Sequence, residues 1–180
     1  MMKTLRFWAA MMIMLIAPVL ASADHLYIGD RHHVPGWDVT HFSPAELACK
    51  GSGQVRIDRD MIHALDEVRA AFGRPIRITS GYRSLSHNAA VGGAKNSQHL
   101  HGKAVDIALD PYSSAERHRL MLLLLDHGFT SFGTYGHIPG MLHADTRGFA
   151  ARWHHGPGQP PAWFLNALEK RGWQHGSGIR

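Results

Sequence analysis

Two short clusters of histidine and aspartate stand out in the sequence. His99 and Asp106 are seven residues apart, and His143 is followed two residues later by Asp145. Imidazole and carboxylate groups are ligands of catalytic zinc, which takes three protein ligands and keeps one position open for water. An aspartate within an apolar strand is costly to bury unless it meets a cation or hydrogen-bond donors. The trio of His99, Asp106 and His143 therefore predicts a zinc site, although spacing alone allows His101 in place of His99.

The composition narrows the other possibilities. The chain has 180 residues, about one domain, with 44% hydrophobic and 18% charged residues, which excludes a wholly disordered, collagen-like or coiled-coil protein. Its one cysteine excludes an internal disulfide and a zinc site built on cysteine pairs. Because there are 15 histidines, surface histidines and a hydrogen-bonded Asp106 are the alternative to a metal site. The net charge of +5 comes from scattered arginines rather than a dense basic stripe, so no nucleic-acid partner is expected.

The first residues have the pattern of an export signal. Lys3 and Arg6 precede an apolar run over 7–20, and the small residues Ala21-Ser22-Ala23 follow it. This pattern is typical of a cleavable signal peptide over residues 1–23. The apolar run is shorter than the roughly 20 residues that a membrane-spanning helix needs. We therefore expect a protein of the periplasm or cell envelope, without a membrane span after cleavage.

The elements that must position the clusters follow from local patterns. Ser43, Pro44 and Glu46 form a helix-start signal, and apolar residues after Asp58 recur at helical spacing up to Gly73. The patterns predict further helices over 113–128 and 162–171, and strands over 75–79, 104–108, 129–135 and 141–145. Helices and strands are mixed without a regular βαβ rhythm, so we expect a single small α+β domain with a mostly antiparallel central sheet flanked by helices.

Two segments have no sustained periodicity. Residues 24–41 are expected to be an irregular N-terminal arm, and residues 80–102, rich in Gly, Ser, Asn and His, a functional loop that forms one wall of a cleft. The central sheet is expected to carry Asp106 in one strand and His143 in another. Alternation along 141–145 places His143 and Asp145 on the same face of that strand.

Several motifs together resemble a known family. They are the Ser80-Gly81-Tyr82-Arg83-Ser84 run, Ser97-x-His99-x-x-Gly102-x-Ala104-x-Asp106, and Leu142-His143-Ala144-Asp145-Thr146-Arg147. This set closely resembles the zinc D-Ala-D-Ala carboxypeptidase family, and within it the YcbK-like group of exported bacterial proteins. The resemblance covers 42–153, which we take as the peptidase-like domain, and leaves 154–180 as a C-terminal helix and tail.

The resemblance implies a fold, a cofactor and a reaction. It implies the hedgehog/D-Ala-D-Ala peptidase fold with one Zn²⁺ per chain, held by His99, Asp106 and His143. It implies hydrolysis of a peptide bond at a D-amino acid in peptidoglycan stem peptides, by a D-Ala-D-Ala carboxypeptidase or a related endopeptidase. Arg83 corresponds to a family arginine that holds substrate or developing negative charge. Ser97 and Tyr82 are the other substrate-binding candidates.

One departure from the family pattern concerns the general base. Family members often carry an acidic residue three positions before the last zinc histidine, and here that position is Gly140. Asp145 is the best substitute, although it could equally orient His143 or pair with Arg147. His137 is the second candidate, with an ordinary loop histidine as its alternative interpretation.

Two other functions stay open, one motivated by Gly140 and the other by the histidine count. The first is a zinc-containing but catalytically impaired module that binds peptidoglycan or a protein partner. The second is a periplasmic metal buffer that uses the many histidines. We expect a monomer.

Overall fold

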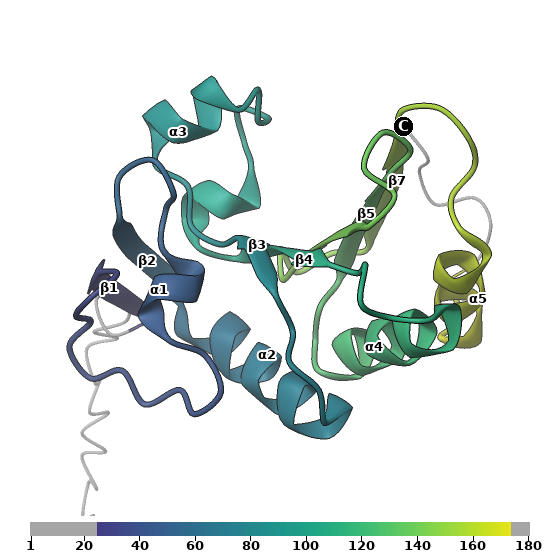
Figure 1. Cartoon of the computed structure of the whole chain (residues 1–180), viewed down its shortest axis with the longest axis horizontal. Helices are drawn as coiled ribbons and strands as arrows, with labels where there is room; N and C mark the ends of the chain where they lie inside the picture. The colour runs from purple at the N-terminus through teal and green to yellow at the C-terminus, as the bar shows by residue number, and fades with distance from the viewer. Residues whose placement is uncertain (1–24, 174–180) are drawn as a thin grey trace, which may run out of the picture.

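The computed structural model describes residues 25–173 of the chain. The predicted signal peptide over 1–23 and the end of the tail, 174–180, lie outside these residues. Within them the chain forms a five-stranded sheet in the order β3-β4-β6-β5-β7 and a separate two-stranded sheet of β1 and β2 (Figure 1). The larger sheet consists of β3 (Ile78–Ser80), β4 (Ala104–Ala108), β6 (Met141–Asp145), β5 (Ser131–Tyr135) and β7 (Ala151–His155). The predicted α+β class is confirmed.

The central strands have the predicted positions. β4 and β6 begin and end where the alternation predicts, and they pair antiparallel. All pairings in the larger sheet are antiparallel except that of β5 with β7, which is parallel. One face of β4 and β6 is apolar, with Val105, Ile107 and Leu142 fully buried in the core. The opposite face carries Asp106 and His143.

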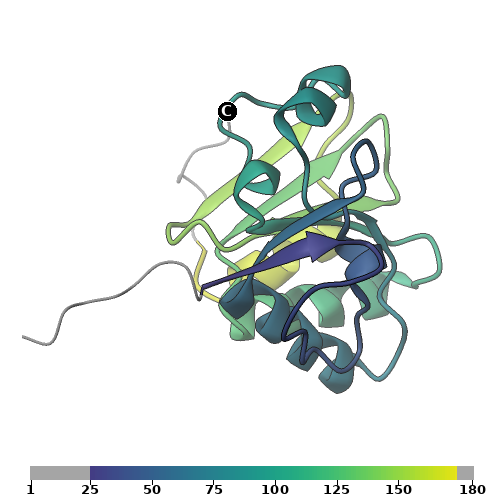
Figure 2. The same cartoon turned by 90° about the vertical axis from the view of Figure 1, so that its left-hand side faces the viewer.

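Three helices cover the apolar face of the sheet. They are α2 (Arg59–Phe72), α4 (Ser114–Asp126) and α5 (Ala162–Lys170), and they lie on the side of the sheet away from α3 (Leu85–Ala90) (Figures 1 and 2). Asp58 caps α2 by accepting a hydrogen bond from the Met61 amide, and Gly73 ends it in the left-handed conformation. Ser113 and Glu116 form a capping box at α4. No helix in residues 25–173 combines the length and apolar character that a membrane crossing requires.

The N-terminal arm is more ordered than its sequence predicts. The expectation of an irregular segment over 24–41 is wrong for β1 (Leu26–Asp30), which pairs antiparallel with β2 (Gln54–Asp58). In β1 Tyr27 is fully buried and Ile28 is exposed, but the strand is too short for this alternation to be recognised. β2 was not predicted either. Its partner lies 28 residues earlier in the chain, and pairing at that distance leaves no local signal.

Two further segments differ from the prediction. Residues 80–102 contain α3, capped by the Ser84 side chain, and a 3-10 helix, η1 (Gln98–His101), where we expected a continuous loop. Both helices are too short to show periodicity. β7 was not predicted, and it runs through residue 153, where the family resemblance ends. The short helix α1 (Pro44–Leu47) has the predicted Ser43–Glu46 capping box.

Candidate metal centre

Three separate elements bring His99, Asp106 and His143 together. His99 lies in η1, Asp106 in the middle of β4, and His143 opposite it in β6, where the register pairs the two residues. His99 Nε2 lies 3.2 Å from His143 Nδ1 and 3.3 Å from Asp106 Oδ1, and His143 Nδ1 lies 2.9 Å from the same oxygen. All three residues are buried. His101, the alternative that spacing allows, is exposed and outside this group.

The turn between His99 and Asp106 depends on glycine. Gly102 ends η1 with φ of 68°, a conformation that residues with a side chain rarely adopt. A β-carbon at this position would lie 2.1 Å from the carbonyl oxygen of Arg56. The close approach of β2 to this turn therefore requires glycine, and the chain can reverse so that His99 and Asp106 face each other.

The hydrogen bonds of His99 and His143 leave one ring nitrogen of each with a free lone pair, and these two nitrogens point toward the same place. His99 Nδ1 lies 2.7 Å from the carbonyl oxygen of Gly81, and His143 Nε2 lies 3.0 Å from Asp145 Oδ2. Both oxygens only accept, so these ring nitrogens carry the protons. His99 Nε2 and His143 Nδ1 then direct lone pairs at each other and at the Asp106 carboxylate. Such an arrangement is unfavourable without a cation, and the donor set suits zinc.

Electrostatics at the centre agree with this interpretation. Burial lowers the pKa of His99, which favours the neutral, metal-binding form. Burial also disfavours the charged form of His143, but without a cation a protonated His143 donates to both Asp106 and Asp145, which outweighs burial and raises the pKa of His143. In the same state, donation from protonated His143 or His99 outweighs the burial of Asp106 and lowers its pKa below the usual range. The group thus combines an ionised carboxylate with two imidazoles, a set of side chains that favours a bound cation.

Arg83 holds the outer oxygen of Asp106. Its Nη2 donates to Asp106 Oδ2, and its Nε donates to the Ser80 hydroxyl over 2.8 Å. The backbone amide of Arg83 donates to the His99 carbonyl, so the same residue also fixes η1. Within the described residues these side-chain bonds leave Nη1 without a protein partner, and the side chain borders the cleft.

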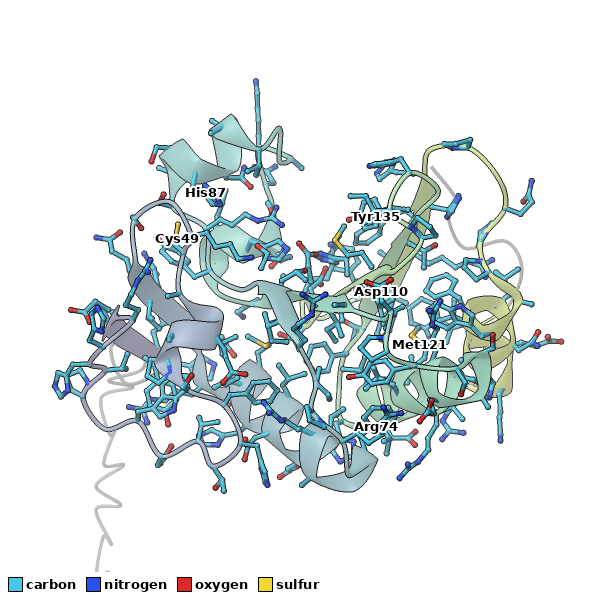
Figure 3. All side chains as sticks on the ribbon, viewed as in Figure 1. Cys49, Arg74, His87, Asp110, Met121 and Tyr135 are labelled. Carbon is cyan, nitrogen blue, oxygen red and sulfur yellow. The ribbon has the colours of Figure 1, made fainter. Side chains whose placement is uncertain are left out.

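A cleft of about 530 Å³ opens above the three residues. One wall consists of residues 91–94 and 96–99, which confirms the prediction that the 80–102 segment forms a cleft wall. Tyr135, His137, Trp153 and His155 form the opposite wall. Figure 3 shows Tyr135 on the β5–β7 side, across from the α3 side where His87 is labelled. The strand β7, absent from the sequence prediction, supplies Trp153 and His155.

The comparison with known proteins agrees with this geometry. A sequence model of the family Peptidase M15 matches residues 40–145, a range that includes His99, Asp106 and His143. The chain belongs to the peptidase M15 family. The zinc D-Ala-D-Ala carboxypeptidase of Streptomyces albus G is 32% identical over 82 residues, which are 42% of this chain and 32% of that protein. The chain therefore matches about a third of the length of this curated relative, and the family resemblance seen in the motifs is confirmed.

In this M15 family member Asp145 lies behind His143 rather than in the cleft. It is fully buried, and both of its oxygens are engaged: Arg147 Nε donates to Oδ1 over 2.8 Å, Arg147 Nη2 donates to Oδ2 over 2.5 Å, and the Arg147 amide also reaches Oδ1. Burial raises its pKa, but the bonds from Arg147 and His143 outweigh burial and lower it. This placement favours the orienting role over that of a general base.

The other predicted site residues are placed as follows. Ser97 borders the cleft, and its hydroxyl makes no capping bond to η1. His137 is exposed in the opposite wall, with its ring edge-on to Tyr135. Tyr82 instead packs against the hydrophobic core and does not border the cleft, so its placement does not support substrate binding. The SGYR motif alone did not indicate that the Tyr82 side chain packs against the core.

The space beside Gly140 is taken by a different carboxylate. A β-carbon at residue 140 would lie 1.9 Å from Asp110 Oδ1, and the three heavy atoms nearest to it all belong to the Asp110 carboxyl group. Asp110 is exposed and lies 3.9 Å from Arg77 Nη2. It is labelled below Tyr135 in Figure 3. The sequence analysis did not identify Asp110, because only the fold brings it next to residue 140.

Gly133 makes room for the tryptophan that covers the centre. The Trp153 ring lies against His143, with 5.0 Å between ring centroids, and a β-carbon at Gly133 would lie 2.3 Å from that ring. Gly133→Ala is therefore expected to displace Trp153 and to lower the free energy of unfolding by about 1–3 kcal/mol. Denaturant titration followed by tryptophan fluorescence measures both effects.

The matched control for this prediction is a double-mutant cycle with Trp153→Ala. Once the ring is removed, Gly133→Ala is expected to be close to neutral. An equal cost in both backgrounds would contradict the assigned contact.

Proposed function

We propose that this protein is an exported zinc peptidase that hydrolyses peptide bonds at D-amino acids in peptidoglycan stem peptides, as a D-Ala-D-Ala carboxypeptidase or a related endopeptidase. The observation that carries the proposal is the convergence of three lone-pair donors at the base of a cleft in a chain of the peptidase M15 family. The similarity to a zinc D-Ala-D-Ala carboxypeptidase supports the substrate class. The pattern of residues 1–23 supports export to the periplasm or cell envelope. The mature protein is proposed to be a monomer.

The residues of the centre would hold one Zn²⁺ through His99 Nε2, Asp106 Oδ1 and His143 Nδ1. Zinc supplies a Lewis acid for the scissile carbonyl and lowers the pKa of water. Asp145 fixes the tautomer of His143 by accepting from Nε2, and Gly81 does the same for His99 at Nδ1. Arg83 keeps the Asp106 carboxylate in place. We therefore assign Asp145 a positioning role.

Two residues of the cleft are suited to hold the substrate. Among residues 25–173 nothing accepts from Arg83 Nη1, so it can donate to a substrate carboxylate or to an oxygen that gains negative charge, which is a strong, charge-assisted contact. Ser97 borders the cleft at the start of η1, and its hydroxyl can bond to the peptide backbone. A carboxypeptidase needs a contact like that of Arg83, because its substrate ends in a carboxylate beside the bond that is cut.

The proton acceptor is proposed to be His137. A general base must border the cleft and have a free acceptor atom, and His137 is exposed there while Asp145 is buried with both oxygens engaged. A neutral imidazole nitrogen of His137 can take the proton from the attacking water and return it to the leaving amine. Asp110, beside Gly140, is the competing carboxylate.

The two candidates for the base are separated by matched variants. His137→Ala is expected to lower kcat by about 10²–10⁴-fold, the range typical of a lost general base. Asp110→Asn is expected to stay within a few-fold of the parent protein, because its carboxyl group does not border the cleft. Steady-state kinetics of D-Ala release measures both. The opposite ranking would assign the base to Asp110.

Gly140 favours one second function, a zinc-containing module that binds peptidoglycan without cutting it. In that case the exported protein binds zinc and sediments with purified peptidoglycan, yet releases no product.

The test of the proposed function uses protein purified after export, with its N-terminus sequenced and its zinc content measured. It is incubated with stem pentapeptides and cross-linked muropeptides, and products are followed by mass spectrometry. Release of terminal D-Ala or cleavage of a cross-link is expected. Zinc-loaded protein that cleaves neither substrate would contradict the peptidase proposal, and retention on peptidoglycan would then support the binding module.

A further inference from the structure

A second group of metal-binding side chains lies outside the cleft. Within residues 25–173, His25, Asp58 and Asp60 each place one ligand atom within 4.8 Å of the others. They meet where β1, β2 and the start of α2 come together (Figure 2). His25 Nε2 lies 3.2 Å from Asp58 Oδ2 and 3.3 Å from Asp60 Oδ2. None of the three residues borders the cleft.

The backbone holds His25 in this position. Its carbonyl oxygen accepts a hydrogen bond of 3.0 Å from the Arg59 amide at the start of α2. The next residue, Leu26, pairs with Asp58 in the β1–β2 ladder. These main-chain contacts place the backbone of His25 beside Asp58 and the start of α2, within reach of the two aspartates.

Asp58 contributes a buried oxygen that lacks a hydrogen bond. The residue is 2% exposed, and its Oδ1 caps α2 by accepting from the Met61 amide. Its Oδ2 is buried and has no hydrogen-bond partner: His25 Nε2 is near but not in hydrogen-bond geometry, and Lys103 Nζ is 3.7 Å away. A buried, unbonded carboxylate oxygen is costly. Because this oxygen is directed at the group, a cation bound there would satisfy it.

The spacing of the ligand atoms fits a small transition-metal ion. Zinc bonds of about 2.0–2.1 Å in a tetrahedral arrangement place neighbouring ligand atoms roughly 3.3 Å apart. The two separations from His25 Nε2 are 3.2 and 3.3 Å, close to those within the proposed catalytic centre. Two carboxylates also offset the positive end of the α2 dipole, which would otherwise disfavour a cation.

We propose that His25 Nε2, Asp58 Oδ2 and Asp60 Oδ2 form a second site for a divalent cation of the zinc class. The His25 and Asp60 side chains are half or more exposed, so water can complete the coordination. The cation displaces the Lys103 ammonium from Asp58. The site ties β1 to the start of α2. Through the hydrogen bond from the Asp58 amide to the Gly102 carbonyl, it also braces the turn between His99 and Asp106.

The experiment is calorimetric titration of the metal-free exported protein with Zn²⁺ alone, together with metal analysis after dialysis. The parent protein is expected to bind two equivalents, and His25→Ala and Asp60→Asn one each. Both changes affect exposed side chains, so the fold is preserved, and circular dichroism verifies this. His32→Ala removes another exposed histidine that lies close by in the chain, and it is expected to retain two equivalents.

A further variant separates a metal site from a simple ion pair. Lys103→Met removes the competing charge, and it is expected to strengthen zinc binding at this site about fivefold, the scale of one unit charge at about 4 Å in water. Unchanged stoichiometry in His25→Ala and Asp60→Asn would overturn the second site. His99→Ala tests the catalytic centre separately, so loss of zinc in that variant but not in His25→Ala overturns the second site alone.

Discussion

His99→Ala is expected to abolish zinc binding at the cleft and peptide hydrolysis, whereas His101→Ala leaves both close to the parent protein. The two histidines share one turn of η1, but only His99 directs a nitrogen at Asp106 and His143. Removing a ligand removes the Lewis acid, which is worth several kcal/mol at the transition state. At about 1.4 kcal/mol per tenfold, kcat/KM is expected to fall by about 10³-fold or more.

Metal analysis and the kinetics of D-Ala release measure this pair of variants, and circular dichroism shows whether each is folded. The comparison is matched, because the two residues have the same type and lie two positions apart. Equal activity of His99→Ala and His101→Ala, with both folded, would show that His99 holds no catalytic metal.

Asp145→Asn is expected to weaken zinc binding at the cleft by about 10–100-fold and to destabilise the fold. The buried carboxylate both sets the tautomer of His143 and pairs with Arg147, whose side chain is partly exposed. Loss of such an outer contact has a typical cost of this size in metal affinity. Loss of the partner of Arg147 adds a cost of about 1–3 kcal/mol, between a surface and a buried ion pair, because Asp145 is fully buried but Arg147 is partly exposed. Zinc titration and denaturant unfolding measure the two effects.

Asp126→Asn is the matched control for this variant. Asp126 accepts two hydrogen bonds from Arg171 with the same atoms and similar distances as Asp145 from Arg147, but the pair is on the surface. We expect a change in stability below about 1 kcal/mol and no change in zinc affinity. If the two variants behave alike, Asp145 does not act through His143.

The parts of the fold that were predicted from the sequence are those with local causes. The caps at Ser43 and Ser113 involve side chains three residues apart, and the strand 141–145 is specified by its own alternation. β1 and β7 were missed because each depends on a partner strand far along the chain. β7 also runs parallel to β5, and parallel strands are not joined by a tight turn that could be recognised in the sequence.

The site shows the same division. The motif that contains His99 and Asp106 predicted the residues that converge, but spacing could not choose between His99 and His101. The 3-10 helix makes that choice by burying one and exposing the other. The role of Asp145 depends on Arg147 engaging both of its oxygens, and the proximity of Asp110 to Gly140 depends on the pairing of β4 with β6. Neither contact has a signature in the sequence.

Anomalous diffraction at the zinc absorption edge, from crystals of the exported protein grown with zinc, tests the catalytic centre most directly. The predicted result is a strong peak at the base of the cleft within bonding distance of His99 Nε2, Asp106 Oδ1 and His143 Nδ1. Zinc bound at full occupancy at other positions, with no anomalous peak between these three atoms, would contradict the account.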